Sequence, residues 1–313
     1  MVRRILLAAF VSAVSLAIYM IRIAPHWLRV TRLKVALPGL PPIWRGVRIA
    51  HLSDFHLGAW GMTGDHLHTA RNITLEFEPD IIALTGDFYD SGKDTSPDGL
   101  YDAWGSGVPV FAVMGNHDRR GVPGTLARIQ AEQERAGVII LDNEASEFGL
   151  RGQPAWVVGV DDAHTFHADV DGAFGMLPGG EIALLFLSHA PAPVRDLPEG
   201  RARLMLAGHT HGGQVRILPS GRMPLTKWIR KLRGARDRPE GPVYRGWHWM
   251  KGTVLVVSDG LGVSTLPIRF LTRPHLILVE LDCADPHADL ACDDINRYVT
   301  DLAPEPWPLS MLS

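Results

Sequence analysis

Cysteine is scarce in this chain of 313 residues, and neither sign of charge predominates. The two cysteines, Cys283 and Cys292, follow no spacing such as Cys-x2-Cys, which excludes a metal site built on thiolates. Whether they form one disulfide or remain two thiols is open. A formal net charge of −3 provides no general surface for tracking phosphates, so we expect no nucleic-acid partner.

Internal repeats and low-complexity tracts are also missing, and no serine or cysteine stands in a recognisable nucleophile motif. The chain therefore does not point to a solenoid protein or to catalysis through a covalent intermediate. Hydrophobic residues make up 46% and charged residues 21%, which is ordinary for a folded protein. A large single domain with a buried core is expected.

What the chain does have is five apolar segments that each lead directly into polar side chains. The segments are Val47–Leu52, Ile81–Thr85, Val110–Met114, Leu184–Ser188 and Leu204–Ala207. The polar residues at their ends are Asp54, His56, Asp87, Asn116, His117, Asp118, His189, His209 and His211. Ligands of open α/β sheets lie beyond the carboxyl ends of the strands. Carboxylate and imidazole groups gathered there predict a site for divalent metal ions.

This set resembles the motif blocks of the calcineurin-like metallophosphoesterases: Asp54-x-His56, Gly86-Asp87, Gly115-Asn116-His117-Asp118, His189 and Gly208-His209-x-His211. The resemblance covers residues 45–281 and implies a two-sheet α/β/β/α sandwich. Two further stretches, residues 37–41 and 260–264, are similar to the membrane-anchored bacterial branch of the family. At position 259 this chain departs from that branch, which usually has arginine there, whereas this chain has Asp259.

The resemblance also implies the roles of the site residues. One ion is expected on Asp54, His56, Asp87 and His211, and a second on Asp87, Asn116, His189 and His209. Mn²⁺, Fe or Zn²⁺ suits such mixed ligands. Two ions about 3.5–4 Å apart would clamp a phosphoryl group, and a hydroxide bridging them would attack it. His117 is expected near the leaving oxygen, with Asp118 orienting its imidazole.

The N-terminus holds the one long apolar run, Ile5–Ile21, which at about 1.5 Å per residue just spans a bilayer core. Three interpretations compete: a signal peptide, although Ile23-Ala24-Pro25 is a poor cleavage site, a twin-arginine export signal, and an uncleaved anchor. We prefer the anchor, a single pass in the bacterial inner membrane. Basic residues after the run weakly favour a catalytic domain on the cytoplasmic side.

The expected domains are an anchor at residues 1–24, a basic, proline-rich connector at 25–45, the metallophosphoesterase domain at 46–283 and a peripheral tail at 284–313. Helices are predicted at Asp65–Phe77, Pro123–Ala136 and Asp169–Met176. Strands of a second sheet are predicted at Val138–Leu141, Ser146–Leu150 and Ala155–Val160, a further strand at Gln214–Leu218, and closing strands at Thr253–Val257 and Leu276–Leu281.

Several other segments are candidates for contact with substrate or membrane. They are the Asp90–Gly99 loop, Asp161–His164, the basic insertion Lys227–Arg238 and Trp247–Met250. The leading hypothesis is hydrolysis of a phosphodiester or pyrophosphate bond in a lipid-linked or sugar-nucleotide substrate such as UDP-diacylglucosamine, with membrane lipids as partners. The alternatives are a broad phosphodiesterase or phosphatase for soluble compounds and a non-catalytic scaffold on the same fold.

Overall fold

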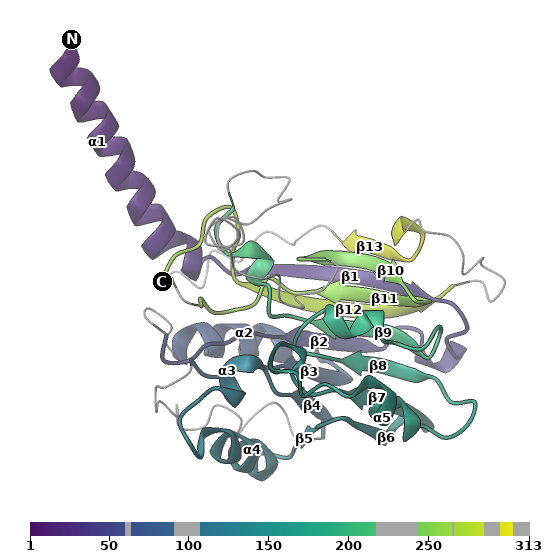
Figure 1. Cartoon of the computed structure of the whole chain (residues 1–313). Coiled ribbons are helices and arrows are strands. Elements are labelled where there is room, and N and C mark those ends of the chain that lie inside the picture. The colour runs from purple at the N-terminus through teal and green to yellow at the C-terminus, as the bar shows by residue number, and fades with distance from the viewer. Residues whose placement is uncertain (60–63, 91–106, 217–242, 265, 285–294, 303–313) are drawn as a thin grey trace.

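The computed structural model describes the whole chain except residues 60–63, 91–106, 217–242, 265, 285–294 and 303–313 (Figure 1). The described residues form a pair of β-sheets that pack face to face. The first sheet has seven strands in the order β13-β1-β12-β2-β3-β4-β5, and the second has six in the order β10-β11-β9-β8-β7-β6. The predicted two-sheet α/β sandwich is confirmed.

The first sheet consists of β1 (Arg29–Leu37), β2 (Arg48–Leu52), β3 (Ile81–Thr85), β4 (Val110–Val113), β5 (Val138–Ile140), β12 (His275–Cys283) and β13 (Val299–Leu302). The second consists of β6 (Glu144–Leu150), β7 (Gln153–Gly159), β8 (Ala183–Leu187), β9 (Ala202–Ala207), β10 (Gly246–Met250) and β11 (Thr253–Val257). The central strands β3, β4 and β8 are buried along their whole length, as parallel strands covered on both faces are.

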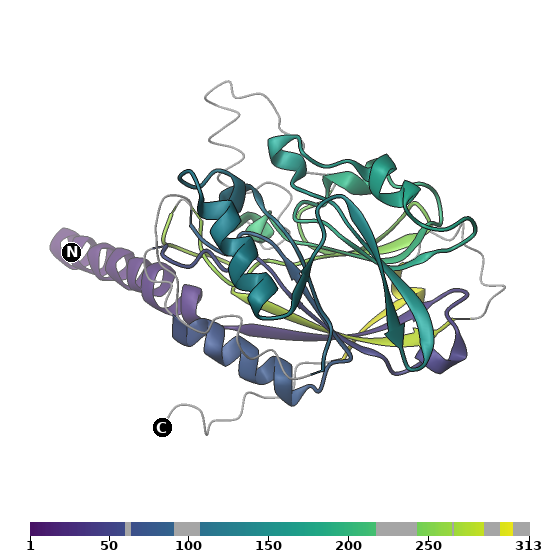
Figure 2. The same cartoon turned by 90° about the horizontal axis from the view of Figure 1, so that it is seen from below.

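Three apolar clusters form the layers of the sandwich. Side chains such as Ile81 and Leu206 fill the space between the two sheets. The outer face of the first sheet packs against α2 (Gly64–Glu76) and α4 (Thr125–Arg135), and that of the second packs against α5 (Val170–Gly175). Figure 2 shows α2 along the outside of the first sheet. Each fully buried Leu or Ile contributes roughly 1.5–3 kcal/mol.

The connector expected at residues 25–45 is wrong over Arg29–Leu37, because these residues form β1, paired in parallel with β12. Its buried positions alternate, with Leu33, Val35 and Leu37 facing inward. This period of two predicts a strand, but the neighbouring prolines concealed it. Beyond β1, Pro42–Trp44 forms a short 3-10 turn.

Three other expectations also need correction. The tail is not wholly peripheral, because β13 pairs with β1. Val138–Leu141 belongs to the first sheet, since β5 pairs with β4. Of the strand expected at Gln214–Leu218, residues 217–218 lie outside the described residues; Gln214 has a φ of 49° and is not in a strand, and Val215 forms an isolated bridge to Phe270.

Trp247–Met250 lies in β10, and its tryptophans pack against the core between the sheets. The Trp249 ring stacks on Tyr298 with the centroids 4.6 Å apart. These residues therefore support the fold, and their tryptophans pack against the core instead of forming a patch that contacts the membrane. The Lys227–Arg238 insertion, residues 91–99 of the loop after β3 and Cys292 lie outside the described residues. Cys283 forms no disulfide with any described residue.

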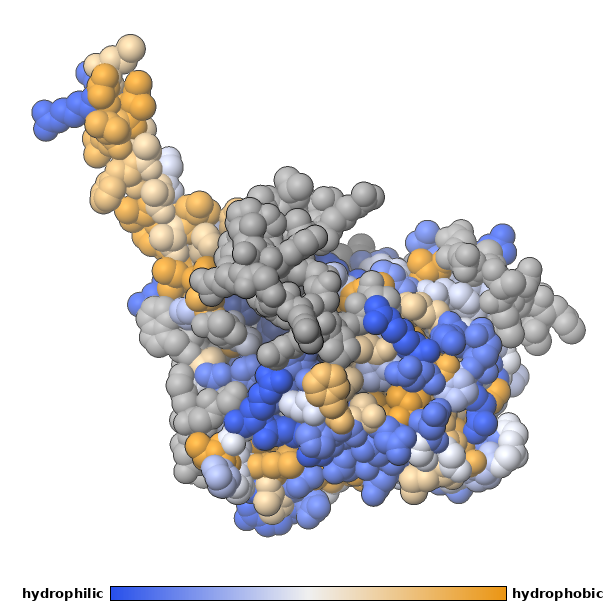
Figure 3. All heavy atoms as spheres, viewed as in Figure 1, coloured by the Kyte–Doolittle hydropathy of each residue, from blue (hydrophilic) through white to orange (hydrophobic). Residues whose placement is uncertain are grey.

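The N-terminal helix projects away from the sandwich, as Figure 1 shows. It begins with α1 (Val2–Ile18) and continues through a π-helical turn, Tyr19–Ile23. The stretch Val2–His26 is the one helix in the described chain that is long and apolar enough to cross a membrane, with a mean hydropathy of 2.1. Its most apolar window buries nothing against the domain, and Figure 3 shows an almost entirely apolar surface. It is a candidate membrane anchor.

Candidate metal centre

The predicted ligands lie just beyond the ends of β2, β3, β4, β8 and β9; Asn116, after β4, is the first residue of the short helix α3 (Asn116–Arg119). Five of them have a left-handed backbone: Asp54 (φ 54°), His56 (47°), Asp87 (55°), His209 (69°) and His211 (50°). Such a conformation costs a non-glycine residue about 1–3 kcal/mol. Five strained residues lie close together in the loops after these strands. Such clustering indicates a site where the backbone is strained in order to orient the side chains.

Glycines allow these loops to approach one another. A Cβ on Gly208 would lie 1.9 Å from Ser53 Oγ and 2.3 Å from Asp54 Oδ2. A Cβ on Gly115 would lie 2.2 Å from Asp87 Oδ1. Both spaces are too small for any side chain, so glycine is required at both positions.

The first group of metal-competent side chains contains Asp54, His56 and His211, whose ligand atoms lie within 4.8 Å of one another. The two Nε2 atoms of His56 and His211 are 3.0 Å apart, and His211 Nε2 is 3.4 Å from Asp54 Oδ1. All three residues are buried. Buried ligand atoms that converge in this way suit a cation.

A second group contains Asp87, His189 and His209. His209 Nδ1 lies 3.2 Å from His189 Nε2. Asp87 Oδ2 lies 3.3 Å from His189 Nε2 and also 3.3 Å from His56 Nε2 of the first group. One carboxylate oxygen is thus equally near to both groups, as a shared ligand would be.

Asn116 adds an amide oxygen to this centre. Its Oδ1 is buried and has no hydrogen-bond partner among the described residues. An acceptor buried without a partner costs about 1–3 kcal/mol unless something else satisfies it. A divalent cation would do so, and the residues present therefore fit a metal.

The protonation states of three histidines and of Asp87 also favour metal binding. Burial lowers the pKa of His56 to about 3 and holds the pKa values of His209 and His211 well below their usual range. Burial alone would raise the pKa of Asp87, yet the His189 and His56 imidazoles hold it well below its ordinary value. Neutral imidazoles and an ionised carboxylate are the forms that bind metals. His189 differs from the other histidines: burial lowers its pKa, but Asp87 raises it well above the usual value, so His189 must release a proton when it binds an ion.

Neighbouring groups hold the ligands in place. His189 Nδ1 is 2.7 Å from the Thr85 carbonyl oxygen, which directs Nε2 toward Asp87. Asp54 accepts hydrogen bonds from Ser53 Oγ at 2.6 Å and from the His209 backbone N–H at 3.0 Å. Such supporting contacts fix the orientation of metal ligands.

Asp118 has a different role from the one expected. Its carboxylate accepts hydrogen bonds from the backbone N–H groups of Asp87 at 2.8 Å, Phe88 at 2.9 Å and Gly115 at 2.8 Å. It therefore ties the loop after β3 to the loop after β4. Asp90, which the sequence did not single out for this purpose, is the carboxylate beside the His117 ring, with Oδ1 3.4 Å from Nδ1.

His117 lies at the edge of the centre. Its side chain is 21% exposed, whereas Asp54 and His56 are fully buried. Nε2 lies 3.4 Å from Ser264 Oγ, and the ring meets His56 edge-on. His117 also groups with His56 and Asp87 as a set that could hold a metal.

Arg269 is a further site residue that the sequence did not reveal. Its guanidinium is fully buried, donates to the carbonyl oxygens of Asp259 and Gly260, and lies 3.5 Å from His211 Nδ1. Burial lowers its pKa to about 10, so it remains charged at neutral pH. It places a positive charge behind the centre, where an anionic substrate would benefit.

The Asp161–His164 segment is largely structural. Asp161 forms an ion pair with Arg119, and the Asp162 carboxylate accepts from the backbone N–H groups of His164 and Thr165. The His164 ring lies beside that of His209, with centroids 4.7 Å apart. Within this segment, His164 is thus the residue whose ring contacts a predicted ligand.

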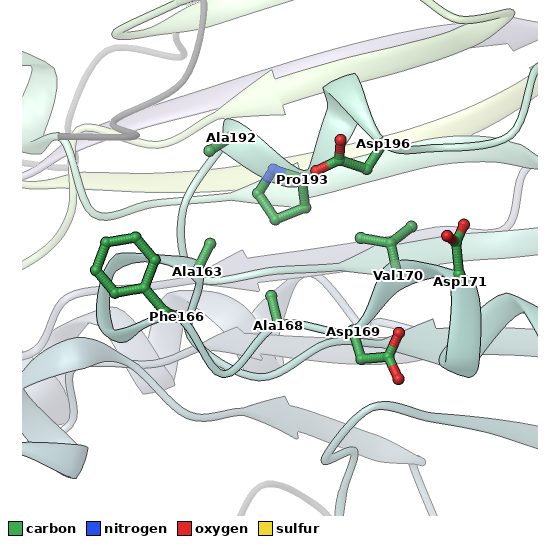
Figure 4. A pocket seen from close by; sticks show the side chains of 9 residues that line it. All are labelled: Ala163, Phe166, Ala168, Asp169, Val170, Asp171, Ala192, Pro193 and Asp196. Carbon is green, nitrogen blue, oxygen red and sulfur yellow. The ribbon is translucent and has the colours of Figure 1, made fainter. Parts of the chain in front are cut away.

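A cavity of about 420 Å³ adjoins this segment. Figure 4 shows Phe166 at one end and the acidic side chains Asp169, Asp171 and Asp196 at the other. Its nine lining residues include no cationic side chain. Negative charge on this side disfavours a phosphate group there.

Comparison with known proteins shows to which family the chain belongs. Residues 47–213, more than half of the chain, match the model of the calcineurin-like phosphoesterase domain. The chain is 28% identical over 249 residues to the uncharacterized metallophosphoesterase YkoQ of Bacillus subtilis, an alignment that covers 75% of this chain and 83% of YkoQ. It is 26% identical over 307 residues to the UDP-2,3-diacylglucosamine pyrophosphatase LpxG of Chlamydia trachomatis (82% and 89%). It is 28% identical over 206 residues to the phosphodiesterase YaeI of Escherichia coli (64% and 72%).

Proposed function

The chain belongs to the calcineurin-like phosphoesterase family and is a metal-dependent phosphoric ester hydrolase, and from this premise we propose that it binds two divalent ions. Asp54, His56, Asp87 and His211 would hold one ion, and Asp87, Asn116, His189 and His209 the other. The position of Asp87 Oδ2 between the two histidine groups supports this division. Mn²⁺, Fe or Zn²⁺ suits these ligands.

When bound, the ions polarise the phosphoryl group and activate water for attack. The residues of the chain position the substrate and move protons. His117, at the partly exposed edge, protonates the leaving oxygen, and the Asp90 carboxylate holds its ring. Arg269 offsets negative charge from behind the centre.

The substrate we propose is a phosphodiester or pyrophosphate in a lipid-linked or sugar-nucleotide compound such as UDP-diacylglucosamine. One observation carries this proposal. Arg269 donates its backbone N–H to the Met20 carbonyl oxygen in the N-terminal helix at 3.0 Å, while its guanidinium lies 3.5 Å from His211. A single residue therefore joins the candidate anchor to the metal centre.

The strand register supports the same proposal. Arg29 at the start of β1 pairs with His275, and two residues along β12 Ile277 pairs with His51 near the end of β2. The helix thus enters the domain at the edge where the ligands lie. With the helix in the bacterial inner membrane and the domain on its cytoplasmic side, the centre would face lipid headgroups. The likeness to LpxG is in keeping with this substrate class.

The test uses detergent-purified full-length protein loaded with Mn²⁺. We expect turnover of UDP-diacylglucosamine at a much higher kcat/KM than that of bis(4-nitrophenyl) phosphate, and none with Asp87→Ala. Equal kcat/KM for lipid and soluble diesters would favour the alternative, a broad phosphodiesterase, which the likeness to YaeI supports. Absence of turnover on every phosphoester with both metals bound would indicate a scaffold.

A further inference from the structure

A second cavity lies where the N-terminal helix meets the domain, and its volume is about 320 Å³. Tyr19 and Trp27 line it from the helix and the turn that follows. Arg29, Arg245, Asp259 and Arg273 line it from the domain. None of these residues is among the proposed metal ligands.

The charges in this cavity do not balance. Arg29 Nη2 and Arg245 Nη2 lie 3.2 Å and 2.9 Å from the same oxygen, Oδ2 of Asp259. Arg273 brings a third guanidinium, so three positive charges meet one carboxylate among the lining residues. The excess of positive charge fits an anion, and guanidinium groups bind phosphate oxygens through paired N–H donors.

Burial strengthens this argument. The Arg29 and Arg245 side chains are each only 29% exposed. Burial lowers the pKa of Arg29, with Asp259 and more weakly Asp301 opposing and Arg245 and Arg273 reinforcing the shift. An anion in the cavity would reduce the repulsion among these arginines. Its attraction to them would also offset part of the free energy that they lose when burial removes their hydration.

The rim of the cavity is apolar and exposed. Trp27 is 52% exposed, and the Arg273 guanidinium lies 4.7 Å from its ring centroid. Leu271 is 39% exposed and has a left-handed φ of 54°. Exposed tryptophan and leucine beside arginine are typical of the level of lipid headgroups in a membrane.

The cavity adjoins the metal centre without being part of it. Asp259, which lines the cavity, accepts through its backbone carbonyl oxygen from Arg269, and the same Arg269 nitrogen lies 3.5 Å from His211. The acidic cavity beside Phe166, by contrast, carries three carboxylates and no cation among its lining residues. The helix-side cavity is therefore the better place for a phosphate outside the metal centre.

We propose that Arg29, Arg245 and Arg273 form a binding site for a phosphate group, and that the phosphate belongs to the headgroup of an anionic lipid. The site rests on the proposed membrane location of the chain but not on hydrolysis at the metal centre. It would hold the domain against the membrane with the centre facing the headgroups.

Full-length, metal-loaded protein in dodecyl maltoside is titrated with dihexanoylphosphatidylglycerol below its micelle concentration, and separately with inorganic phosphate. The test variants are Arg273→Gln and the pair Arg245→Gln with Arg273→Gln. Arg135→Gln, on the exposed side of α4, is the matched control. We expect the lipid to bind about 10-fold or more weakly to the double variant and to be unaffected by the control.

Unchanged lipid affinity in either test variant, with melting temperature and metal content preserved, overturns the proposal. Arg273→Gln alone keeps the test decisive if the double variant fails to fold, because Arg273 is not one of the two arginines on Asp259 Oδ2. A weakened response to inorganic phosphate with no lipid binding would overturn the lipid as the source. Turnover of a soluble diester by wild-type protein is measured separately, so failure of the proposed hydrolase function is distinguished from failure of this site.

Discussion

Gly115→Ala tests the geometry of the centre without altering any proposed ligand. A Cβ at this position would lie 2.2 Å from Asp87 Oδ1, 2.5 Å from the Asp87 backbone nitrogen and 2.9 Å from its Cγ. Ordinary contact needs at least about 3.4 Å, so the Asp87 carboxylate must move by roughly 1 Å. The three atoms nearest to the added Cβ all belong to Asp87, so the strain falls on this residue.

A shift of this size is large on the scale of metal binding. Proposed metal sites tolerate deviations of about 0.2 Å in ligand distance, and Asp87 Oδ2 is the atom shared between the two histidine groups. We therefore expect weaker binding of both ions and a loss of about 10²-fold or more in kcat/KM. The melting temperature should fall modestly, as overpacking costs about 1–3 kcal/mol.

The assay combines metal content by mass spectrometry with turnover of bis(4-nitrophenyl) phosphate under Mn²⁺. Gly149→Ala in β6 is the matched control, because a Cβ there meets nothing within 4 Å. The control should keep wild-type activity. A Gly115→Ala protein with full metal content and full turnover would refute the argument that this contact positions Asp87.

Three further predictions concern single side chains. His117→Ala should lower turnover by about 10²–10⁴-fold for a leaving group of high pKa and by less for 4-nitrophenolate, while the protein keeps its metals. Equal losses for both leaving groups, accompanied by loss of metal, would instead make His117 a metal ligand. Asn116→Ala should bind one of two ions more weakly and leave the melting temperature of metal-free protein nearly unchanged or raised, because its Oδ1 has no partner in the described chain; a large loss of apo stability would contradict this. Burial lowers the pKa of His51 from 6.5 to about 3, so the stability that neutral His51 contributes is present above pH 6.5 and declines as pH falls toward 3. Between pH 7.5 and 5 this amounts to roughly 2 kcal/mol, and His51→Gln should show a correspondingly smaller drop in melting temperature, while an unchanged pH profile would count against it.

The sequence predicted the sandwich because its central strands are continuous apolar runs ending in polar loops. The strands β3 and β8 lie where the runs Ile81–Thr85 and Leu184–Ser188 predict them, to within a residue. It was harder to predict which sheet a short strand joins and whether residues 29–37 form a strand. Val138–Ile140 is too short to show which sheet it joins. β1 is recognisable only from its period-two pattern, in which Arg32 and Lys34 alternate with buried residues, and the prolines that follow it concealed this pattern.

Some side chains around the metal centre could be predicted from the sequence, and others could not. Asp54 and Asp87 stand in local motifs, so their convergence could be predicted from the ends of the strands. Asp90 and Arg269 could not, because their roles depend on contacts between distant segments, such as the 3.4 Å approach of Asp90 to His117. Asp118 looked like a partner for its neighbour His117, but its carboxylate is occupied by backbone N–H groups of two loops.

The central claim is that one carboxylate, Asp87, serves two metal ions. Titration of metal-free wild-type protein with Mn²⁺, followed by calorimetry, should show about two ions bound per chain. Asp87→Asn, which keeps the shape of the side chain but removes its charge, should weaken both binding events together, since Asp87 Oδ2 is equally near to His56 and His189. A variant that still binds one ion with wild-type affinity, or active wild-type protein that binds only one, would contradict the account.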